Sequence, residues 1–219
     1  MDISSAITSD LYLEDILKLI VMVTAKVTGV EICSLWLVDE EDGKIRLKAT
    51  QAIDKDYVKD RVLNLNEGVV GYVVATKQPL IVWDVLKEPR FKEKEMAKKL
   101  GLRSMASIPL QVRDEKIIGV LNCFTSEYHD FTETEISLIK TVANQSAVAI
   151  FNSELLVKTK VIQEELETRK LIERAKEILM RRMNIKSDEA FRWLQKKSMD
   201  SRKSMRQIAE AILLSDDFF

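Results

Sequence analysis

The feature that most constrains the fold is the spacing of apolar residues near the C-terminal end of the chain. Within residues 170–214 they recur every three or four positions in three runs, which are separated by polar breaks at 184–187 and 200–201. This period is typical of helices that bury one face, so the segment is predicted to form a three-helix bundle. Ser187 and Ser201 are the expected N-caps of the second and third helices. The expected core positions are Ile172, Ala175, Ile178, Leu179, Met183, Ala190, Phe191, Leu194, Ser198, Met205, Ile208, Ala209, Ile212 and Leu213.

The basic side chains are concentrated in the same segment. Residues 169–206 contain 13 Lys and Arg against 5 Asp and Glu, whereas residues 1–157 contain 19 against 24. The formal net charge of −1 therefore combines a segment of +8 with a domain of −5. A helical bundle with this excess of positive charge indicates an anionic partner, most simply a nucleic acid, in preference to a solvated surface balanced by salt bridges.

The same segment resembles the ANTAR domain. The resemblance rests on Ala175, Ile178, Leu179 and Met180, then Ala190, Phe191 and Leu194, then residues 198–200, then Ile208, Ala209 and Ile212. Glu177 stands where that family often has Gly, and Ile208 where it often has Val. ANTAR domains bind tandem small hairpins in nascent transcripts and prevent a terminator from forming, so the resemblance implies an RNA-binding antiterminator. The alternative is a DNA-binding helix-turn-helix made from the last two runs, because the break near residue 200 has a suitable length.

The predicted RNA surface consists of the positions that face away from the bundle core. The candidates are Arg181, Arg182, Arg192, Lys196, Lys197, Ser201, Arg202, Lys203, Arg206 and Gln207, with Trp193 as a further stacking candidate that is more often a packed residue at this spacing. The first turn of the third helix is expected to add backbone N–H groups that favour phosphate. Hairpin loops are also read through stacking and base edges.

Composition places limits on the rest of the chain. Hydrophobic residues make up 46% and charged residues 32%, no apolar run reaches 18 residues, and the N-terminus lacks a signal-peptide pattern. We therefore predict a cytoplasmic protein without a membrane segment. Cys33 and Cys123 lie in apolar, strand-like runs and are predicted to be reduced core thiols. Together with the single His129 they cannot build a typical structural zinc site, and no metal or cofactor is predicted.

The first 157 residues show the pattern of an α+β domain. An amphipathic helix is predicted over 11–28, with Asp10 as its cap and Gly29 just past its end. Pro109 suggests an edge position or a bulge in its strand. The other predicted elements are a hairpin of strands 32–38 and 44–53 with one wet face, a short helix after Gly68, a strand at 80–83, a helical turn at 94–100 closed by Gly101, and strands at 104–112 and 116–125.

These elements resemble a GAF domain over nearly all of residues 11–156. The resemblance rests on the runs 67–73, 78–79, 82–85, 89–91, 107–110, 118–121 and 131–132. It implies a GAF-like antiparallel sheet with flanking helices, a small molecule held between the sheet and its cover, and dimerisation through the terminal helices. The weak ligand-binding candidates are Val70, Trp83, Asp84, Met105 and Ser107. The Asn-Lys pair of cyclic-nucleotide-binding members is missing, so the ligand is not identified, and an empty domain that serves only as a dimer scaffold is the alternative.

A long helix is predicted to connect the two domains. Thr132 is its expected cap, and after Gly119 the sequence contains no Gly or Pro that would end the helix before Met183. Such a helix would be roughly 78 Å long at about 1.5 Å per residue. Its apolar stripe predicts a coiled-coil homodimer in preference to a frayed linker. The stripe consists of Val148, Phe151, Leu155, Ile162 and Leu166, and the predicted domains are 1–157 (sensor), 158–169 (linker helix) and 170–219 (RNA-binding bundle).

Two other protein classes fit the sequence poorly. Asp39 and Asp84 both follow apolar strands, as the phosphoacceptor of a receiver domain would, but a receiver begins with a strand and this chain begins with a helix. A catalytic protein is not predicted either, because one histidine and no nucleophile elbow leave no recognisable catalytic constellation.

Overall fold

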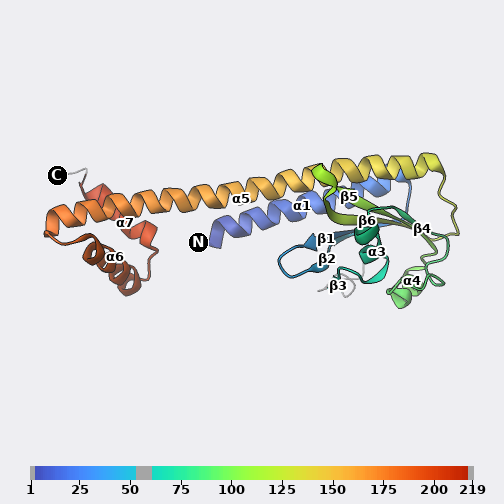
Figure 1. Cartoon of the computed structure of the whole chain (residues 1–219), viewed down its shortest axis with the longest axis horizontal. Helices are drawn as coiled ribbons and strands as arrows, with labels where there is room; N and C mark the ends of the chain where they lie inside the picture. The colour runs from blue at the N-terminus through green and yellow to red at the C-terminus, as the bar shows by residue number, and fades with distance from the viewer. Residues whose placement is uncertain (1–2, 53–60, 217–219) are drawn as a thin grey trace. The chain divides into compact units, whose positions relative to one another are not determined.

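The computed structural model describes residues 3–52 and 61–216, which form two compact units that divide between Leu155 and Leu156. The first unit contains a sheet with helices, and the second contains helices alone. The elements are α1 (Ile3–Thr28), β1 (Ile32–Asp39), β2 (Lys44–Thr50), β3 (Val62–Asn64), α3 (Gly68–Thr76), β4 (Leu80–Val82), α4 (Lys94–Leu100), β5 (Ser104–Gln111), the 3-10 turn η1 (Arg113–Glu115), β6 (Ile117–Thr125), α5 (Glu133–Met183), α6 (Ser187–Ser201) and α7 (Met205–Asp216) (Figure 1). This is the predicted α+β sheet domain followed by a long helix and a helical C-terminal unit.

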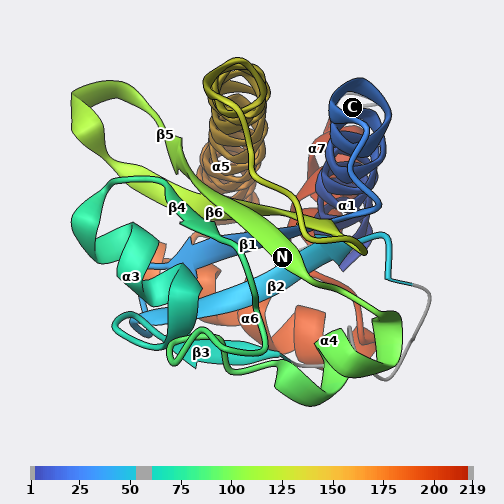
Figure 2. The ribbon, with the colours of Figure 1, turned by 90° about the vertical axis from the view of Figure 1, so that its right-hand side faces the viewer.

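The sheet has six antiparallel strands in the order β3-β2-β1-β6-β5-β4. Helices α1 and α5 lie side by side over one face, and α3 and α4 lie at the other (Figure 2). Side chains on the central strands therefore alternate between two cores: Leu35 packs beneath α1 and α5, and its neighbour Trp36 packs beneath α3. Strands buried on both faces are expected to read as continuous apolar runs, as β1 and β6 do.

Strands β1 and β6 approach each other so closely that one position on β6 requires glycine. Gly119 pairs with Leu37, and a Cβ atom at Gly119 would lie 2.2 Å from the carbonyl oxygen of Trp36. Cys33 and Cys123 are also directly opposite each other in this ladder, with their Sγ atoms 3.7 Å apart, and both are free thiols. They are fully buried, as expected of core cysteines.

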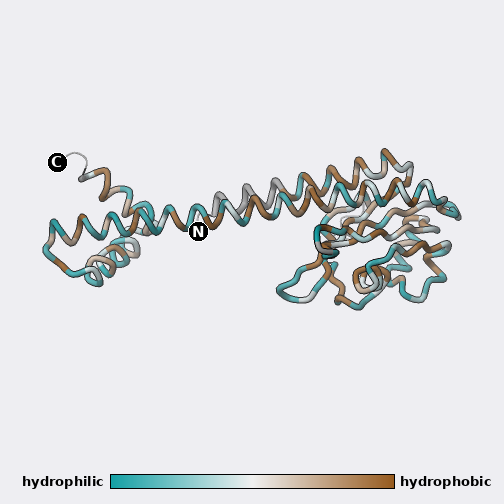
Figure 3. Tube along the Cα trace, turned by 45° about the horizontal axis from the view of Figure 1, so that its top comes forward, coloured by the Kyte–Doolittle hydropathy of each residue, from teal (hydrophilic) through white to brown (hydrophobic). Residues whose placement is uncertain are grey.

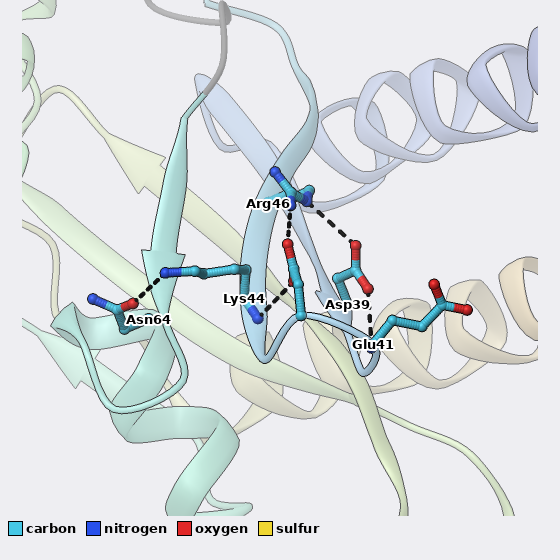
Figure 4. Close-up of polar contacts among 6 residues, drawn as sticks. Asp39, Glu41, Lys44, Arg46 and Asn64 are labelled. Atoms are coloured by element: carbon cyan, nitrogen blue, oxygen red, sulfur yellow. Dashed lines mark hydrogen bonds and ion pairs between the residues drawn. The ribbon is translucent and has the colours of Figure 1, made fainter.

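The β1–β2 turn is fixed by two aspartates. Asp39 accepts a hydrogen bond from the N–H of Glu41 (3.1 Å), and Asp42 accepts one from the N–H of Lys44 (3.0 Å). Arg46 bonds to both carboxylates (Figure 4). The backbone N–H of Glu41, assisted by the guanidinium group of Arg46, lowers the pKa of Asp39. Asp39 is therefore a turn-forming residue in this fold.

Several predicted boundaries in the first unit are confirmed, and others are wrong. Gly29 and Gly101 follow α1 and α4 with φ values of 74° and 69°. The last residue of β5 that pairs with β4 is Ser107, opposite Leu80. Pro109 comes two residues later, where β5 pairs only with β6, so it has the local edge position that was predicted. Helix α1, however, begins at Ile3, so Asp10 lies inside the helix and is not its cap; no Gly or Pro precedes it to delay the start. The short strand β3 was not predicted, and residue 53 at the end of the predicted second strand lies outside the described residues.

The three predicted helices of the second unit pack around one apolar core. Its buried residues are Ala175, Leu179, Ala190, Leu194, Ile208 and Ala209, with Leu171, Ile172, Ile185, Trp193, Met205 and Ile212 packed around them. Trp193 therefore has a packing role. Met183 and Phe191 were predicted in the core but are 48% and 41% exposed. Both lie at the edge of the apolar stripe of their helix, which the short helices α6 and α7 leave uncovered.

Both predicted caps in this unit are wrong by one to three residues. The N–H of Lys186 donates to Glu189 Oε2 (2.9 Å), which makes Lys186 the cap of α6 and Ser187 its first residue. Helix α6 extends through Ser201, so the predicted break at 200–201 lies inside the helix. The cap of α7 is Ser204, which exchanges two hydrogen bonds with Gln207 (3.0 and 3.2 Å). The Ser-x-x-Gln sequence of a capping box begins at 204 and not at 201.

Helix α5 is continuous over 51 residues, as predicted. Its N-terminal end is closed by Thr132 and Glu135. The N–H of Thr132 donates to Glu135 Oε2 (2.7 Å), and the N–H of Glu135 donates to Thr132 Oγ1 (3.3 Å). The hydrogen bond from the Thr132 N–H is the main cause of a lowered pKa at Glu135.

Among the residues that the structure describes, no helix has the length and apolar character needed to cross a membrane.

Candidate nucleic-acid interface

Helix α6 presents basic side chains on the side opposite its buried residues. Ala190 and Leu194 are fully buried, whereas Arg192 and Lys196 are exposed. Arg192 and Lys196 are four residues apart and so lie on one face of the helix. Lys197 is also exposed, but it follows Ala190 by seven residues, which is two helical turns. It therefore shares the side of Ala190 and does not join Arg192 and Lys196 as predicted.

The turn after α6 adds two more exposed basic residues. Arg202 closes α6 in the left-handed conformation (φ 54°), and its N–H donates to the carbonyl of Met199 (3.3 Å). Ser198 Oγ donates to the carbonyl of Lys203 (2.5 Å) and fixes the turn from the other side. The side chains of Arg202 and Lys203 are both exposed. We call Arg192, Lys196, Arg202 and Lys203 the α6–turn patch.

The first turn of α7 is less available for RNA than predicted. Gln207 Oε1 accepts from the N–H of Ser204, and the N–H of Gln207 donates to Ser204 Oγ. Two backbone N–H groups that could bind phosphate are thus occupied. Arg206 donates to Glu210 Oε1 (2.9 Å) and its side chain is 34% exposed, so its charge is partly balanced. Ser201 is exposed, and its hydroxyl donates to the carbonyl of Lys197 (2.6 Å).

Arg182, in the last turn of α5, lies near the C-terminal end of α7. Arg182 Nη2 donates to the carbonyl of Ser215 (3.3 Å). Ser215 is 11 residues after Ser204, which corresponds to about 17 Å along a helix. Arg182, a candidate of the predicted RNA surface, therefore does not lie near the start of α7. Arg182 thus lies toward the α5–α6 end of the bundle and Arg202 and Lys203 lie at the α6–α7 end, with Arg192 and Lys196 between them along α6.

The predicted dimer stripe on α5 is accessible to solvent. In the first unit Val148 is 50% and Leu155 45% exposed, and Phe151 is half-buried against the core beneath the helix. In the second unit Ile162 is 58% and Leu166 53% exposed. Helix α1 adds exposed apolar residues, including Leu19 and Met22, and apolar positions recur along both α1 and α5 (Figure 3).

The predicted ligand candidates do not converge on one pocket. Val70 lines a cavity of only about 20 Å³ beneath α3. Met105 and Ser107 are fully buried, and Ser107 Oγ donates to Asn122 Oδ1 (2.6 Å). Trp83 is 55% exposed and stacks on Tyr128, with ring centroids 5.6 Å apart. Asp84 is buried and accepts from the N–H of Leu86 (3.0 Å) and from the hydroxyl of Tyr128 (3.2 Å), so it fixes the loop after β4.

A larger cavity, of about 180 Å³, lies at the N-terminal end of α5 and was missed by the sequence analysis. His129 is half-buried in its wall and contacts Glu135 (3.0 Å). Two stretches of the chain, residues 28–31 and 125–139, build this cavity, and the one sequence signal for it was the short run from His129 to Glu135. The lining residues are Thr28, Gly29, Val30, Glu31, Thr125, Glu127, Tyr128, His129, Phe131, Glu135 and Ile139.

Comparison with known families agrees with this architecture. The model of the GAF domain matches residues 11–150, and the model of the ANTAR domain matches residues 160–213. The chain belongs to the GAF domain family. More particularly, the chain is a GAF domain followed by an ANTAR domain.

Curated relatives cover the two parts separately. The phosphoenolpyruvate-dependent phosphotransferase system protein of Escherichia coli K12 is 27% identical over 143 residues, which is 65% of this chain and 19% of that protein. The transcriptional regulatory protein PdtaR of Mycobacterium tuberculosis CDC 1551 is 44% identical over 52 residues, which is 24% of this chain and 25% of that protein. The chain thus spans a quarter or less of either relative.

Solved structures show the same sheet domain. The GAF domains of phosphoenolpyruvate-protein phosphotransferases from Acinetobacter and from Coxiella burnetii are each 26% identical to this chain, with TM-scores of 0.57 and 0.59. They cover 66% and 65% of this chain, and the matches span 85% and 84% of those chains. The free methionine-R-sulfoxide reductase of Neisseria meningitidis, 21% identical with a TM-score of 0.52, shares the fold, covering 63% of this chain and 76% of its own. This fold therefore also occurs in an enzyme, and the fold alone does not define a function.

Proposed function

We propose that this protein is a signal-responsive transcription antiterminator that binds tandem RNA hairpins as a homodimer. The observation that carries the proposal is the α6–turn patch, four exposed basic residues on a three-helix bundle that matches the ANTAR domain. Lys and Arg on an ordered surface supply phosphate contacts. The dimer would use the apolar stripe on α5, so that two bundles could engage two hairpins. The GAF domain would receive the signal.

The DNA-binding alternative is less well supported by the distribution of charge. In a helix-turn-helix the second helix enters the major groove and carries the base-reading side chains. That helix would be α7, whose sequence MRQIAEAILLSD contains Arg206 as its single basic residue. Arg206 is paired with Glu210. The basic residues lie instead on α6 and in the turn, which favours contact with a folded RNA backbone over insertion into a groove.

We also propose that the GAF domain senses and does not catalyse. A reductase of this fold would need an accessible cysteine with a thiolate character. Cys33 and Cys123 are fully buried. The hydrogen bond to Cys33, together with burial, raises the pKa of the Cys123 thiol. Such a thiol is a poor nucleophile at neutral pH.

The RNA assignment is tested by a direct comparison of nucleic acids. Tandem-hairpin RNAs with randomised loops are first selected for binding to the intact protein. The selected RNA and duplex DNA of the same sequence are then titrated separately against the protein at physiological salt. We expect the selected RNA to bind about 100-fold more tightly than the DNA, with an affinity that falls steeply as salt rises. Equal affinity for the duplex DNA would replace the RNA assignment with the DNA alternative.

A further inference from the structure

The cavity at the N-terminal end of α5 lies entirely within the first unit, and we call it the α5-root cavity. It is formed where the end of α1, the start of β1, the loop after β6 and the first turns of α5 meet. Its volume of about 180 Å³ contrasts with about 20 Å³ for the cavity beneath α3. It is large enough to hold several water molecules or a small organic ligand.

The hydrogen-bond donors described around this cavity are already used within the protein. Backbone N–H groups of Gly29, Glu31 and His129 donate to Ala25 O (2.9 Å), Phe124 O (3.1 Å) and Ser104 Oγ (2.9 Å). Hydroxyl groups of Thr28, Thr125 and Tyr128 donate to Thr24 O (2.7 Å), Glu127 O (2.9 Å) and Asp84 Oδ2 (3.2 Å). A hydroxyl that has donated its proton still has lone pairs. The side-chain groups that line the cavity therefore present mainly acceptors to a ligand.

The charge of the lining points the same way. Three glutamates, Glu31, Glu127 and Glu135, line the cavity together with His129, and none of the described lining residues is Lys or Arg. Ser126 Oγ donates to Glu31 Oε1 (2.8 Å), which leaves the second oxygen of Glu31 as an acceptor. The C-terminal end of the 26-residue helix α1 also lies at this cavity and carries partial negative charge. Arg103 lies over the ring of Tyr128, 5.7 Å from its centroid, and is not a lining residue.

An anionic ligand is not favoured, although a helix begins here. The N-terminal end of α5 would attract an anion if its first N–H groups were available. Its own capping box occupies the N–H groups of Thr132 and Glu135, and the N–H of Ile136 donates to the carbonyl of Thr132 (2.9 Å). The protein's own carboxylate, Glu135, already takes the place that an anion would have.

We propose that the α5-root cavity binds a small organic cation with N–H donors, of the alkylammonium or guanidinium class. The ammonium group would donate to the carboxylates of Glu31 and Glu127 and would lie beside that of Glu135. Glu135 belongs both to the cavity and to the capping box that begins α5. Ligand binding would therefore act directly on the first turn of the helix that leads to the RNA-binding unit. The proposal supplies a class of signal for the regulator proposed above, but its test requires no RNA, so either can fail alone.

The test uses the intact protein with ¹³C-labelled isoleucine methyl groups and ethylammonium chloride as the probe. Ile139 lines the cavity, and Ile45 lies in the other core and serves as an internal reference. We expect ethylammonium to shift the Ile139 methyl resonance saturably in the millimolar range, as befits a ligand of three non-hydrogen atoms. Potassium chloride at equal ionic strength, ethanol and sodium acetate should give no saturable shift.

The variants identify the groups responsible. Changing Glu31 and Glu127 together to Gln removes two carboxylates without touching the capping box, and should weaken ethylammonium binding about tenfold or more. A matched double change, Glu40→Gln with Glu95→Gln, removes two exposed carboxylates elsewhere in the same unit and should leave binding unchanged. The proposal is overturned if ethylammonium gives no saturable shift up to tens of millimolar, if the Glu31/Glu127 variant binds as the wild type does, or if acetate produces the larger shift.

Discussion

Changing Lys196, Arg202 and Lys203 together to Gln is expected to weaken tandem-hairpin binding by about 100-fold at physiological salt. All three side chains are exposed and none belongs to the apolar core of the bundle. The three side chains are expected to contact phosphates, so their loss should also make the slope of log affinity against log salt shallower. At about 0.7 per contact, three lost contacts change the slope by about 2 per bundle. Filter binding or fluorescence anisotropy over a series of salt concentrations measures both quantities.

The control for this variant removes the same charge from the other unit. Lys48, Lys87 and Lys98 are exposed, and changing them to Gln should alter RNA affinity by less than about threefold. Both triple variants should keep the helicity of the wild type and a free energy of unfolding within about 0.5 kcal/mol per substitution. Wild-type affinity in the Lys196/Arg202/Lys203 variant would remove the α6–turn patch from the RNA surface.

Changing Ile162 and Leu166 to Glu is expected to convert the protein from a dimer to a monomer at tens of micromolar. Each side chain is more than half exposed in the single chain, so its burial would come from the second copy. Burying the exposed half of four aliphatic side chains contributes roughly 3–7 kcal/mol per dimer, against about 8 kcal/mol for a micromolar dimer, and the new carboxylates oppose burial further. Sedimentation velocity reports the change directly. Affinity for a tandem hairpin should then fall to that for a single hairpin, because the two bundles no longer bind as one unit.

A matched pair of substitutions separates position from charge. Leu156 and Gln163 are exposed, and each directly follows a residue of the stripe, so each lies about 100° away around the helix. Changing both to Glu adds the same new charges but should leave the dimer intact. A monomeric wild type, or a dimer that survives Ile162→Glu with Leu166→Glu, would show that this stripe is not the interface.

The long helix and the bundle could be predicted because their signals extend over many residues. Ala175, Leu194 and Ala209 each repeat a spacing that recurs throughout their helix, and a single mistaken position does not change the period. Helix ends depend instead on a few competing hydrogen bonds. Ser201 and Ser204 are equally plausible caps from residue type, and the partner at Gln207 decides between them.

The arrangement of site residues could be predicted only in part, because it depends on which segments meet. The exposed face of α6 follows from its period, but the contact between Arg182 and Ser215 depends on the direction in which α7 packs. The α5-root cavity joins residues from Thr28 to Ile139 that share no local pattern. Trp83 and Asp84 are adjacent in sequence, yet one is exposed and the other buried, because the chain turns after β4.

The most direct test of the central claim is transcription itself. A tandem-hairpin sequence selected by binding is placed so that it overlaps a terminator, and single-round transcription is measured with and without the protein. We predict that the wild-type protein increases the fraction of full-length transcript and that the Lys196/Arg202/Lys203 variant does not. Readthrough that stays at the level of the protein-free reaction, while the protein is shown to be bound to the hairpins, would contradict the assignment as an antiterminator.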